Sequence, residues 1–158
     1  MRRNQPLLGV GVALDVACGL GQNSIWLARH GYTVLGVDLS LVALRRARAE
    51  ARVQRVLKRT CFAQVDLDIW EPAAMSVDLI CVFRFLDRQL IDPLKRALRP
   101  GGLIFYETRH RGVLRSQPDA NPAFLLRADD FLQWFGEWHT LYEVSDSQNA
   151  AIVARKPG

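Results

Sequence analysis

The fold of this chain is decided by the stretch Asp15–Asn23, which reads DVACGLGQN. An apolar run, residues 10–16, leads into it, and a helical stretch, residues 23–30, follows it. Gly19 and Gly21 let the backbone turn sharply and approach a ligand without a Cβ in the way, and the helix beyond offers free N–H donors. The stretch predicts a strand, a tight turn and a helix. Taken alone, it also fits a plain strand–helix turn without a ligand.

Strands and helices alternate from this point to the end of the chain. The last two strands are separated by only a few residues, which is too short for a parallel crossover, so they must form an antiparallel hairpin at a sheet edge. The predicted fold is α/β: a doubly wound, mostly parallel seven-stranded sheet with an antiparallel C-terminal hairpin, in a single domain over residues 1–158. The expected strands are 10–16, 33–37, 61–65, 77–83, 103–106, 139–144 and 150–154, and the later helices are one that begins after Ser40, 87–98 and 128–135.

Prolines and glycines set the details of the second half of the chain. Pro93 must lie in the first turns of helix 87–98 or kink it. Residues 100–102, Pro-Gly-Gly, predict a turn before the fifth strand, and residues 109–123 predict a loop.

The composition excludes several classes of protein. With 49% hydrophobic and 23% charged residues, the chain is neither disordered nor of low complexity. Cys18, Cys61 and Cys81 lie far apart without a Cys-x-x-Cys pair, which argues against a disulfide scaffold and a structural zinc site. No cluster suggests a metal, and no apolar run reaches the ~18 residues of a membrane span. We expect a cytoplasmic protein without a membrane partner.

Arginines recur at helical spacing after Ser40. The net charge is +5, and Arg45, Arg48, Arg52, Arg55 and Arg59 follow one another at intervals of three or four residues, as one stripe on a helix would. A solvated helix face and a surface for phosphates or an acidic partner both fit this stripe. An apolar stripe that we expect to face the core runs beside it, formed by Val42, Ala49, Val53 and Val56.

Acidic residues end the second and third strands. In such sheets ligands bind beyond the carboxyl ends of the strands. Asp38 stands 17 residues after Gly21, where a carboxylate can accept both hydroxyls of a ribose. Asp66 is placed to accept from an adenine amino group. The alternatives are a helix-capping role for Asp38 and a solvent-facing turn for Asp66.

Two nucleotide ligands fit a glycine turn followed by an acidic residue. NAD prefers a third glycine, but Ser24 stands three positions after Gly21, and 158 residues leave little room for a second mononucleotide half. S-adenosylmethionine needs one nucleoside site and a place for its amino-acid tail. The C-terminal hairpin also favours S-adenosylmethionine.

The sequence resembles the class I S-adenosylmethionine-dependent methyltransferases. It is most similar to the small bacterial branch typified by the tellurite-resistance methyltransferases. The resemblance implies S-adenosylmethionine as the cofactor and methyl transfer as the activity. The matching segments are ALDVACGLGQNSIWLA (13–28), VLGVDLS (34–40), VDLICVFRFLDR (77–88), LRPGGLIFYET (98–108), NPAFLLR (121–127) and AAIVARKP (150–157).

The resemblance also assigns cofactor-binding residues. Those implied at the methionine end are Asp15, Ala17, Gly19 and Gly21; Asp38 is implied at the ribose, and Asp66 with Leu67 at the adenine; Val82 and Phe83 bound the cofactor from the fourth strand; and Asn23 and Leu39 are further implied cofactor-binding residues. The family usually has a helical N-terminal segment that covers the cofactor. Because the first strand begins within about ten residues of Met1, we expect this N-terminal cap to be missing. The site would then be open, or covered by a partner or a second copy of the chain in a homo-oligomer, or the reading frame would be truncated.

The methyl acceptor is less well defined. The chain has neither an Asn/Asp-Pro-Pro-aromatic motif after the fourth strand nor a Pro-Cys nucleophile. Basic residues follow the fourth and fifth strands, and of these Arg84, Arg109 and His110 are the candidates for catalysis, with Arg111 and Arg127 nearby. They suit an anionic acceptor, although solvated loop charges fit as well. We expect a small-molecule acceptor, such as a thiol or a chalcogen oxyanion. The alternatives are a non-catalytic, partner-completed cofactor-binding subunit and an RNA-modifying methyltransferase that uses the arginine stripe.

Overall fold

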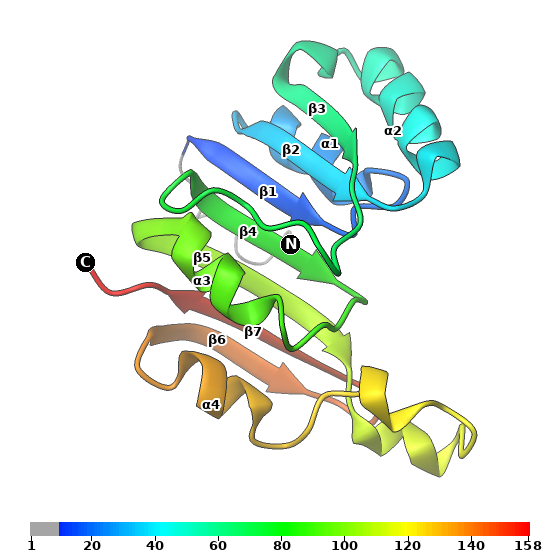
Figure 1. The fold of residues 1–158 in the computed structure, drawn as a ribbon, viewed down its shortest axis with the longest axis vertical. Coiled ribbons are helices and arrows are strands. Elements are labelled where there is room, and N and C mark those ends of the chain that lie inside the picture. Colours follow the sequence, from blue (N-terminus) through cyan, green and yellow to red (C-terminus); the bar gives the residue numbers. More distant parts are fainter. Residues whose placement is uncertain (1–9) are drawn as a thin grey trace.

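The structure, a computed structural model, describes residues 10–158 (Figure 1). A seven-stranded sheet with the order β3-β2-β1-β4-β5-β7-β6 runs through this part of the chain. The neighbours from β3 to β5 pair in parallel, while β7 runs antiparallel to both β5 and β6. The predicted α/β sheet with a C-terminal hairpin is thereby confirmed. The strands are β1 Val12–Val16, β2 Thr33–Asp38, β3 Thr60–Gln64, β4 Val77–Phe83, β5 Leu98–Arg109, β6 His139–Ser145 and β7 Asn149–Arg155.

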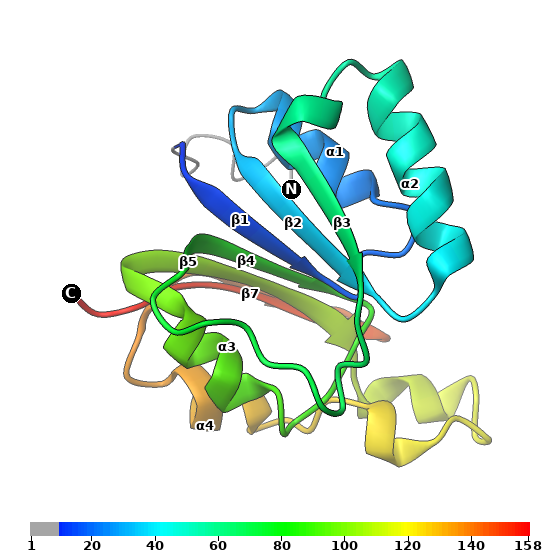
Figure 2. The same ribbon diagram turned by 45° about the horizontal axis from the view of Figure 1, so that its top comes forward.

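Helices cover both faces of this sheet (Figure 2). Helices α1 and α2 pack on one face, and α3 and α4 pack on the other. The α-helices are α1 Gln22–Arg29, α2 Leu41–Val53, α3 Ile91–Ala97 and α4 Asp130–Phe135, and short 3-10 turns span Leu57–Arg59, Arg111–Arg115 and Pro122–Phe124.

The central strand β4 links the two halves of the core. Its side chains alternate between the faces: Leu79 and Cys81 join the cluster under α1 and α2, while Ile80 and Val82 join the cluster under α3 and α4. All four are at most 1% exposed. A nearly continuous apolar sequence is what a strand buried on both faces requires.

The orientation of α2 shows that the expected apolar stripe does not face the core. Its buried residues are Leu44, Ala47 and Ala51, whereas Val42 is 63% and Val53 is 71% exposed. The helix carries two apolar faces, and the one with alanines packs on the sheet because small side chains allow close approach. Val56 is buried, but it lies beyond the end of α2. The arginine stripe is also shorter than expected, because Arg55 and Arg59 follow α2 rather than continue it.

The boundary between α3 and β5 differs from the expected one. The helix begins at Ile91 rather than at residue 87, with Pro93 in its first turn, and Leu98 already belongs to β5. The expected Pro-Gly-Gly turn lies inside this strand. Gly101 bends the strand with a φ of 76°, and its N–H donates to the carbonyl of Lys156. The residues that follow β7 thus hold the start of β5 in place.

Three expectations concern features that the chain should lack. The expected absence of an N-terminal cap concerns residues 1–9, which lie outside the described residues. Among residues 10–158, no helix has both the length and the apolar character needed to span a bilayer. The same range contains no group of three or more His, Cys, Asp and Glu side chains placed to share a metal ion.

Candidate functional site

The glycine turn after β1 forms a cradle of backbone at the carboxyl edge of the sheet. Ala17, Gly19 and Gly21 have φ angles of 52°, 54° and 72°, so three residues of one turn are in the left-handed region. A Cβ on Gly21 would meet the Cβ of Ala47 at 2.8 Å, because α2 lies directly against the turn. A Cβ on Gly19 would meet nothing within 4 Å. The turn is therefore closely packed on the side of α2 and open at Gly19.

Asp38 ends β2 beside this turn, and two backbone groups orient its carboxylate. The N–H of Gly19 donates to Oδ2 at 2.8 Å, and the N–H of Ser40 donates to Oδ1 at 2.8 Å. Each carboxylate oxygen retains capacity for a further hydrogen bond. The carboxylate is fixed before a ligand arrives, and it can accept two hydroxyl groups. Ser40 also accepts from the N–H of Ala43 and so caps α2, the helix expected to begin after Ser40.

Asp15 supports the turn from inside the protein. Its side chain is 1% exposed, and its Oδ2 accepts a hydrogen bond from the Ser24 hydroxyl at 2.5 Å. Burial raises the pKa of Asp15 to about 6. Burial and the charges of Asp15 and Asp38 raise the pKa of the Cys18 thiol to about 12. Cys18 therefore stays protonated and acts as an apolar core residue.

The remaining expected cofactor residues lie at the same edge. Asp66 is exposed in the turn after β3, where its Oδ1 accepts from the N–H of Asp68 at 3.1 Å. Val82 is buried and Phe83 is half-buried at the end of β4, next to the end of β1. Residues with partly or largely exposed side chains are Asn23 in α1, Leu39 after β2 and Leu67 after Asp66.

The cradle fits S-adenosylmethionine on its own geometry. An open glycine turn with left-handed backbone, a helix N-terminus behind it and a pre-oriented carboxylate on the next strand suit a nucleoside with a polar tail. Asp38 would hold the ribose hydroxyls, and Gly19 would allow the amino-acid tail to approach the backbone.

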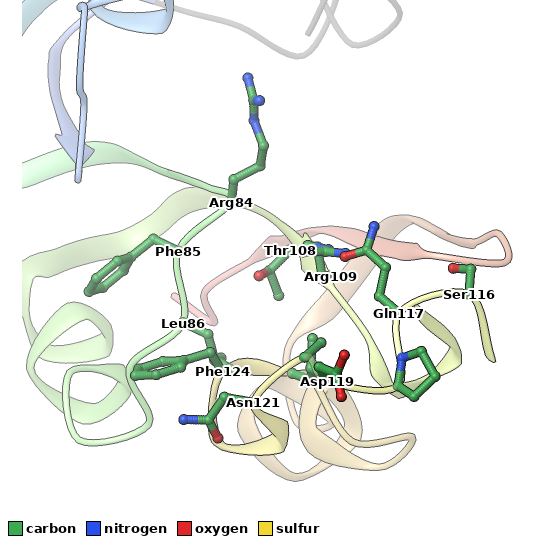
Figure 3. Close-up of a pocket in the computed structure, with 13 residues that line it drawn as sticks. Arg84, Phe85, Leu86, Thr108, Arg109, Ser116, Gln117, Asp119, Asn121 and Phe124 are labelled. Carbon is green, nitrogen blue, oxygen red and sulfur yellow. The ribbon is translucent and has the colours of Figure 1, made fainter. Parts of the chain in front are cut away.

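A cavity of about 820 Å³ lies next to the cradle, at the ends of β4 and β5 (Figure 3). Arg84 directly follows β4 with a φ of 56°, which is unusual for a long side chain. Its guanidinium group makes no hydrogen bond or ion pair with any residue from 10 to 158, and Figure 3 shows it extended away from Asn121 and Phe124. Arg109 comes from the end of β5, and its Nη2 donates to Oε1 of Gln117 at 2.5 Å.

His110 is not part of this cavity. Its Nδ1 accepts from the N–H of Gly112 at 2.9 Å, so its Nε2 carries the proton and donates to the carbonyl of Asp146 at 2.7 Å. Both ring nitrogens are engaged by backbone, which leaves none free to act as a general base. His110 instead lines a second hollow, together with Arg111 and Arg127. The structure brings together Arg84 and Arg109 but not the other basic candidates.

Several side chains of the cavity could not be expected from the sequence. One wall of the cavity consists of residues 116–121 together with Phe124 and Leu125. The sequence predicts residues 116–121 only as part of a loop. Arg88 holds this wall: it donates to the carbonyls of Ala123 and Leu125 at 2.9 and 3.0 Å and to Oδ2 of Asp130 at 2.6 Å. The side chain of Asp130 is 3% exposed. No sequence spacing signals these contacts, because the partners lie 35 to 42 residues apart.

Comparison with known proteins agrees with this geometry. The methyltransferase domain family matches residues 13–102, which include the cradle and β4. The chain belongs to this methyltransferase family. The class expected from the sequence, the S-adenosylmethionine-dependent methyltransferases, is confirmed, and the cofactor of this class is S-adenosylmethionine.

Individual relatives and solved structures are also similar to this chain. A ubiquinone biosynthesis O-methyltransferase of Idiomarina loihiensis is 35% identical over 106 residues, covering 63% of this chain and 43% of that protein. The chain thus spans less than half the length of this curated relative. An S-adenosylmethionine-dependent methyltransferase from Mesorhizobium loti superposes with a TM-score of 0.78 at 19% identity, covering 98% and 95% of the two chains. TehB from Haemophilus influenzae gives a TM-score of 0.79 at 20% identity, covering 98% and 60%. The two structural likenesses concern the fold.

Proposed function

We propose that this chain transfers the methyl group of S-adenosylmethionine to a small anionic acceptor bound in the cavity that Arg84 and Arg109 line. The observation that carries the proposal is the position of these two side chains. They come from adjacent parallel strands, β4 and β5, and line one cavity that begins where the cofactor-binding residues of β4 end. Guanidinium groups bind oxyanions and carboxylates through paired hydrogen bonds. A chalcogen oxyanion suits this cavity better than a neutral thiol.

Methyl transfer asks the protein mainly for alignment. The bound cofactor supplies an activated methyl group, which leaves its sulfur with the bonding electrons remaining on the sulfur. Asp38 and the glycine turn would hold the nucleoside, and Arg84 and Arg109 would hold the acceptor in line with the methyl carbon. Proximity and orientation supply ~7–11 kcal/mol in favourable systems. The proposal therefore needs no dedicated general base, consistent with the engaged nitrogens of His110.

Arg84 is suited to this role because its conformation is not explained by packing. A left-handed residue that is not glycine costs about 1–2 kcal/mol. The exposed Arg84 side chain gains no hydrogen bond or ion pair within residues 10–158 to offset this cost. A long, unpaired cation kept at a strained position beside a cavity is typical of a binding residue.

The cofactor half of the proposal is tested at Asp38. Asp38→Ala loses two charge-assisted hydrogen bonds to the ribose, so calorimetry should show the affinity for S-adenosylhomocysteine lowered at least about tenfold. Asp38→Asn should do less harm because one acceptor oxygen remains. NAD should produce no thermal shift in the unmodified chain. Unchanged affinity in Asp38→Ala would refute the assigned nucleoside site.

The acceptor half is tested by Arg84→Gly, with Arg111→Gly as the matched control outside the cavity. Glycine relieves the left-handed strain but loosens the unfolded chain, so stability should rise by at most about 1 kcal/mol. Turnover with selenite or tellurite, measured as S-adenosylhomocysteine release, should show KM raised about tenfold or more, as expected from the loss of one charge-assisted hydrogen bond. Turnover that is equal in the two variants would contradict the anionic acceptor. Cofactor binding without turnover on thiols or oxyanions would favour the partner-completed subunit.

A further inference from the structure

The layer formed by α1, α2 and the turn after α2 carries the positive charge of this molecule. Residues 10–60 contain eight basic and three acidic residues, an excess that equals the net charge of +5 of the whole chain. Two of the three acidic residues do not contribute to the surface of this layer, because Asp15 is buried and Asp38 faces the cofactor cradle. The basic residues of segment 41–59 are Arg45, Arg46, Arg48, Arg52, Arg55, Lys58 and Arg59, against the single acidic residue Glu50.

These basic side chains are exposed and almost entirely without partners. Arg59 donates to the carbonyl of Gly31, but no other basic side chain of segment 41–59 forms a hydrogen bond or ion pair within residues 10–158. Glu50 instead accepts a hydrogen bond from Gln54. Elsewhere in the described chain, arginines such as Arg88 and Arg99 are paired with carboxylates. The charge of this segment is therefore unneutralised by the protein itself.

The outward face of α2 combines this charge with exposed apolar side chains. At 100° per residue, the direction opposite to the buried Leu44, Ala47 and Ala51 is occupied by Val42, Ala49 and Val53. Val42 is 63% and Val53 is 71% exposed. The flanking positions on this outward face are held by Arg45, Arg46 and Arg52. The result is a narrow apolar stripe bordered on both sides by arginines.

Exposed leucines also lie at the start of α2, just before it and in the glycine turn. Leu41 begins the helix and is 43% exposed, and Leu39 before it is 64% exposed. Leu20, within the glycine turn, is 49% exposed. The hydrogen bond from Gly19 to Asp38 ties the turn to the end of β2, so these leucines lie on linked segments of the same sheet edge.

We propose that the outward face of α2 docks the protein on an anionic lipid bilayer surface. Arginines bordering an apolar stripe are typical of helices that lie in the membrane interface, where apolar side chains enter the acyl boundary and cations meet anionic headgroups. Docking through α2 would also bring the start of this helix, which follows the carboxyl end of β2, close to the bilayer. The proposal departs from the expected absence of a membrane partner, and it is independent of the identity of the acceptor.

Other occupants of this face fit the observations less well. A second copy of the chain that paired α2 with α2 would bring like charges together. Single-stranded RNA is bound by aromatic side chains on which bases stack, and segment 41–59 contains no Phe, Tyr or Trp. Exposed valines and leucines contribute nothing to a phosphate contact, whereas a bilayer interface buries them.

The test measures co-sedimentation of the full chain with phosphatidylcholine vesicles and with vesicles that also contain about 30% phosphatidylglycerol. Binding should require the anionic lipid and weaken as salt rises from about 0.1 to about 0.5 M. The triple variant Arg45→Glu, Arg46→Glu, Arg52→Glu should bind at least about 100-fold more weakly. The matched control carries the same charge change at other exposed arginines: Arg115→Glu, Arg127→Glu and Arg155→Glu.

One further double variant and a competing ligand make the result decisive. Val42→Ser with Val53→Ser keeps all charges, so reduced vesicle binding would support the apolar contribution, and unchanged binding would refute it. Equal loss in the two triple variants would show a general charge effect and overturn the assigned face. Binding to a double-stranded RNA duplex but not to vesicles would replace the bilayer with RNA. No binding to either would leave α2 as a solvated face and refute the proposal.

Discussion

The two halves of the site are built by different means. The cofactor cradle consists of a backbone turn and a carboxylate held by backbone N–H groups, with Gly19 bonded to Asp38. The cavity proposed for the acceptor consists of side chains from two strand ends and a loop, and the Arg88 side chain holds that loop through contacts with Ala123, Leu125 and Asp130. The bond in the cradle joins residues 19 positions apart, whereas the contacts that hold the cavity wall join residues 35 to 42 positions apart.

Because of this difference, we expect the two halves to tolerate amino-acid substitutions unequally. A backbone cradle tolerates few substitutions, because any Cβ at a left-handed, closely packed position changes the geometry. A cavity wall made of loop side chains can change its lining while the supporting contact remains. One cofactor site can then serve different acceptors. Changes in the free energy of unfolding at three positions test this difference between the two halves.

Arg88→Met should be the most damaging change, and it acts on the cavity half. Among residues 10–158, it leaves the buried Asp130 carboxylate with only the N–H of Arg127 as a donor, at 2.8 Å. Breaking a buried ion pair costs about 3–5 kcal/mol. Denaturant unfolding should show this loss, and hydrogen exchange should locate the loosening in residues 111–126. Arg96→Met is the control, because its pair with Glu71 is exposed and should be worth about 0–1 kcal/mol.

If Arg88→Met and Arg96→Met lowered the free energy of unfolding equally, the ion pair between Arg88 and Asp130 would contribute no more than an exposed pair. If Arg88→Met also abolished binding of S-adenosylhomocysteine, the two halves would not be separate. We expect cofactor affinity to change less than acceptor binding in this variant.

Gly21→Ala should be the next most damaging change, and it acts on the cradle half. The added Cβ meets Ala47 at 2.8 Å and stands at a φ of 72°. Overpacking and left-handed strain together should cost about 2–4 kcal/mol. Gly19→Ala shares the left-handed backbone but meets no atom within 4 Å, so it should cost only about 1–2 kcal/mol. Thermal unfolding of the two variants measures the difference, and equal losses would contradict the close contact with α2.

The smallest effect concerns the pH dependence contributed by Asp15. Burial raises its folded pKa from 3.8 to about 6, so between these values the folded state binds more protons than the unfolded state. The stability contributed by this group is full below the unfolded pKa and is lost as pH rises through about 6. The total change should be about 1–3 kcal/mol. Denaturation from acid to neutral pH should show this decline, and Asp15→Asn should remove it. An equal pH slope in both proteins would contradict the raised pKa.

Two features of the site show how far the sequence could predict it. The glycine turn, the position of Asp38 at a strand end and the antiparallel C-terminal hairpin could be predicted, because apolar runs, glycine spacing and short connections are local signals that have a direct structural meaning. The inclusion of Arg84 and Arg109 in one cavity also follows from parallel strands, whose carboxyl ends meet at one edge. The contacts of Gln117 and Arg88 could not be predicted, because they join loop residues whose conformation depends on distant partners.

Local sequence patterns were sufficient to predict a mostly parallel sheet with a glycine turn after its first strand. Which face of α2 is buried depends on packing in the tertiary structure, because Val42 and Val53 repeat at helical spacing as regularly as Leu44 and Ala51. Periodicity identifies apolar faces, but the closeness of packing against the sheet selects between them. That selection placed valines and arginines together on the outside of α2.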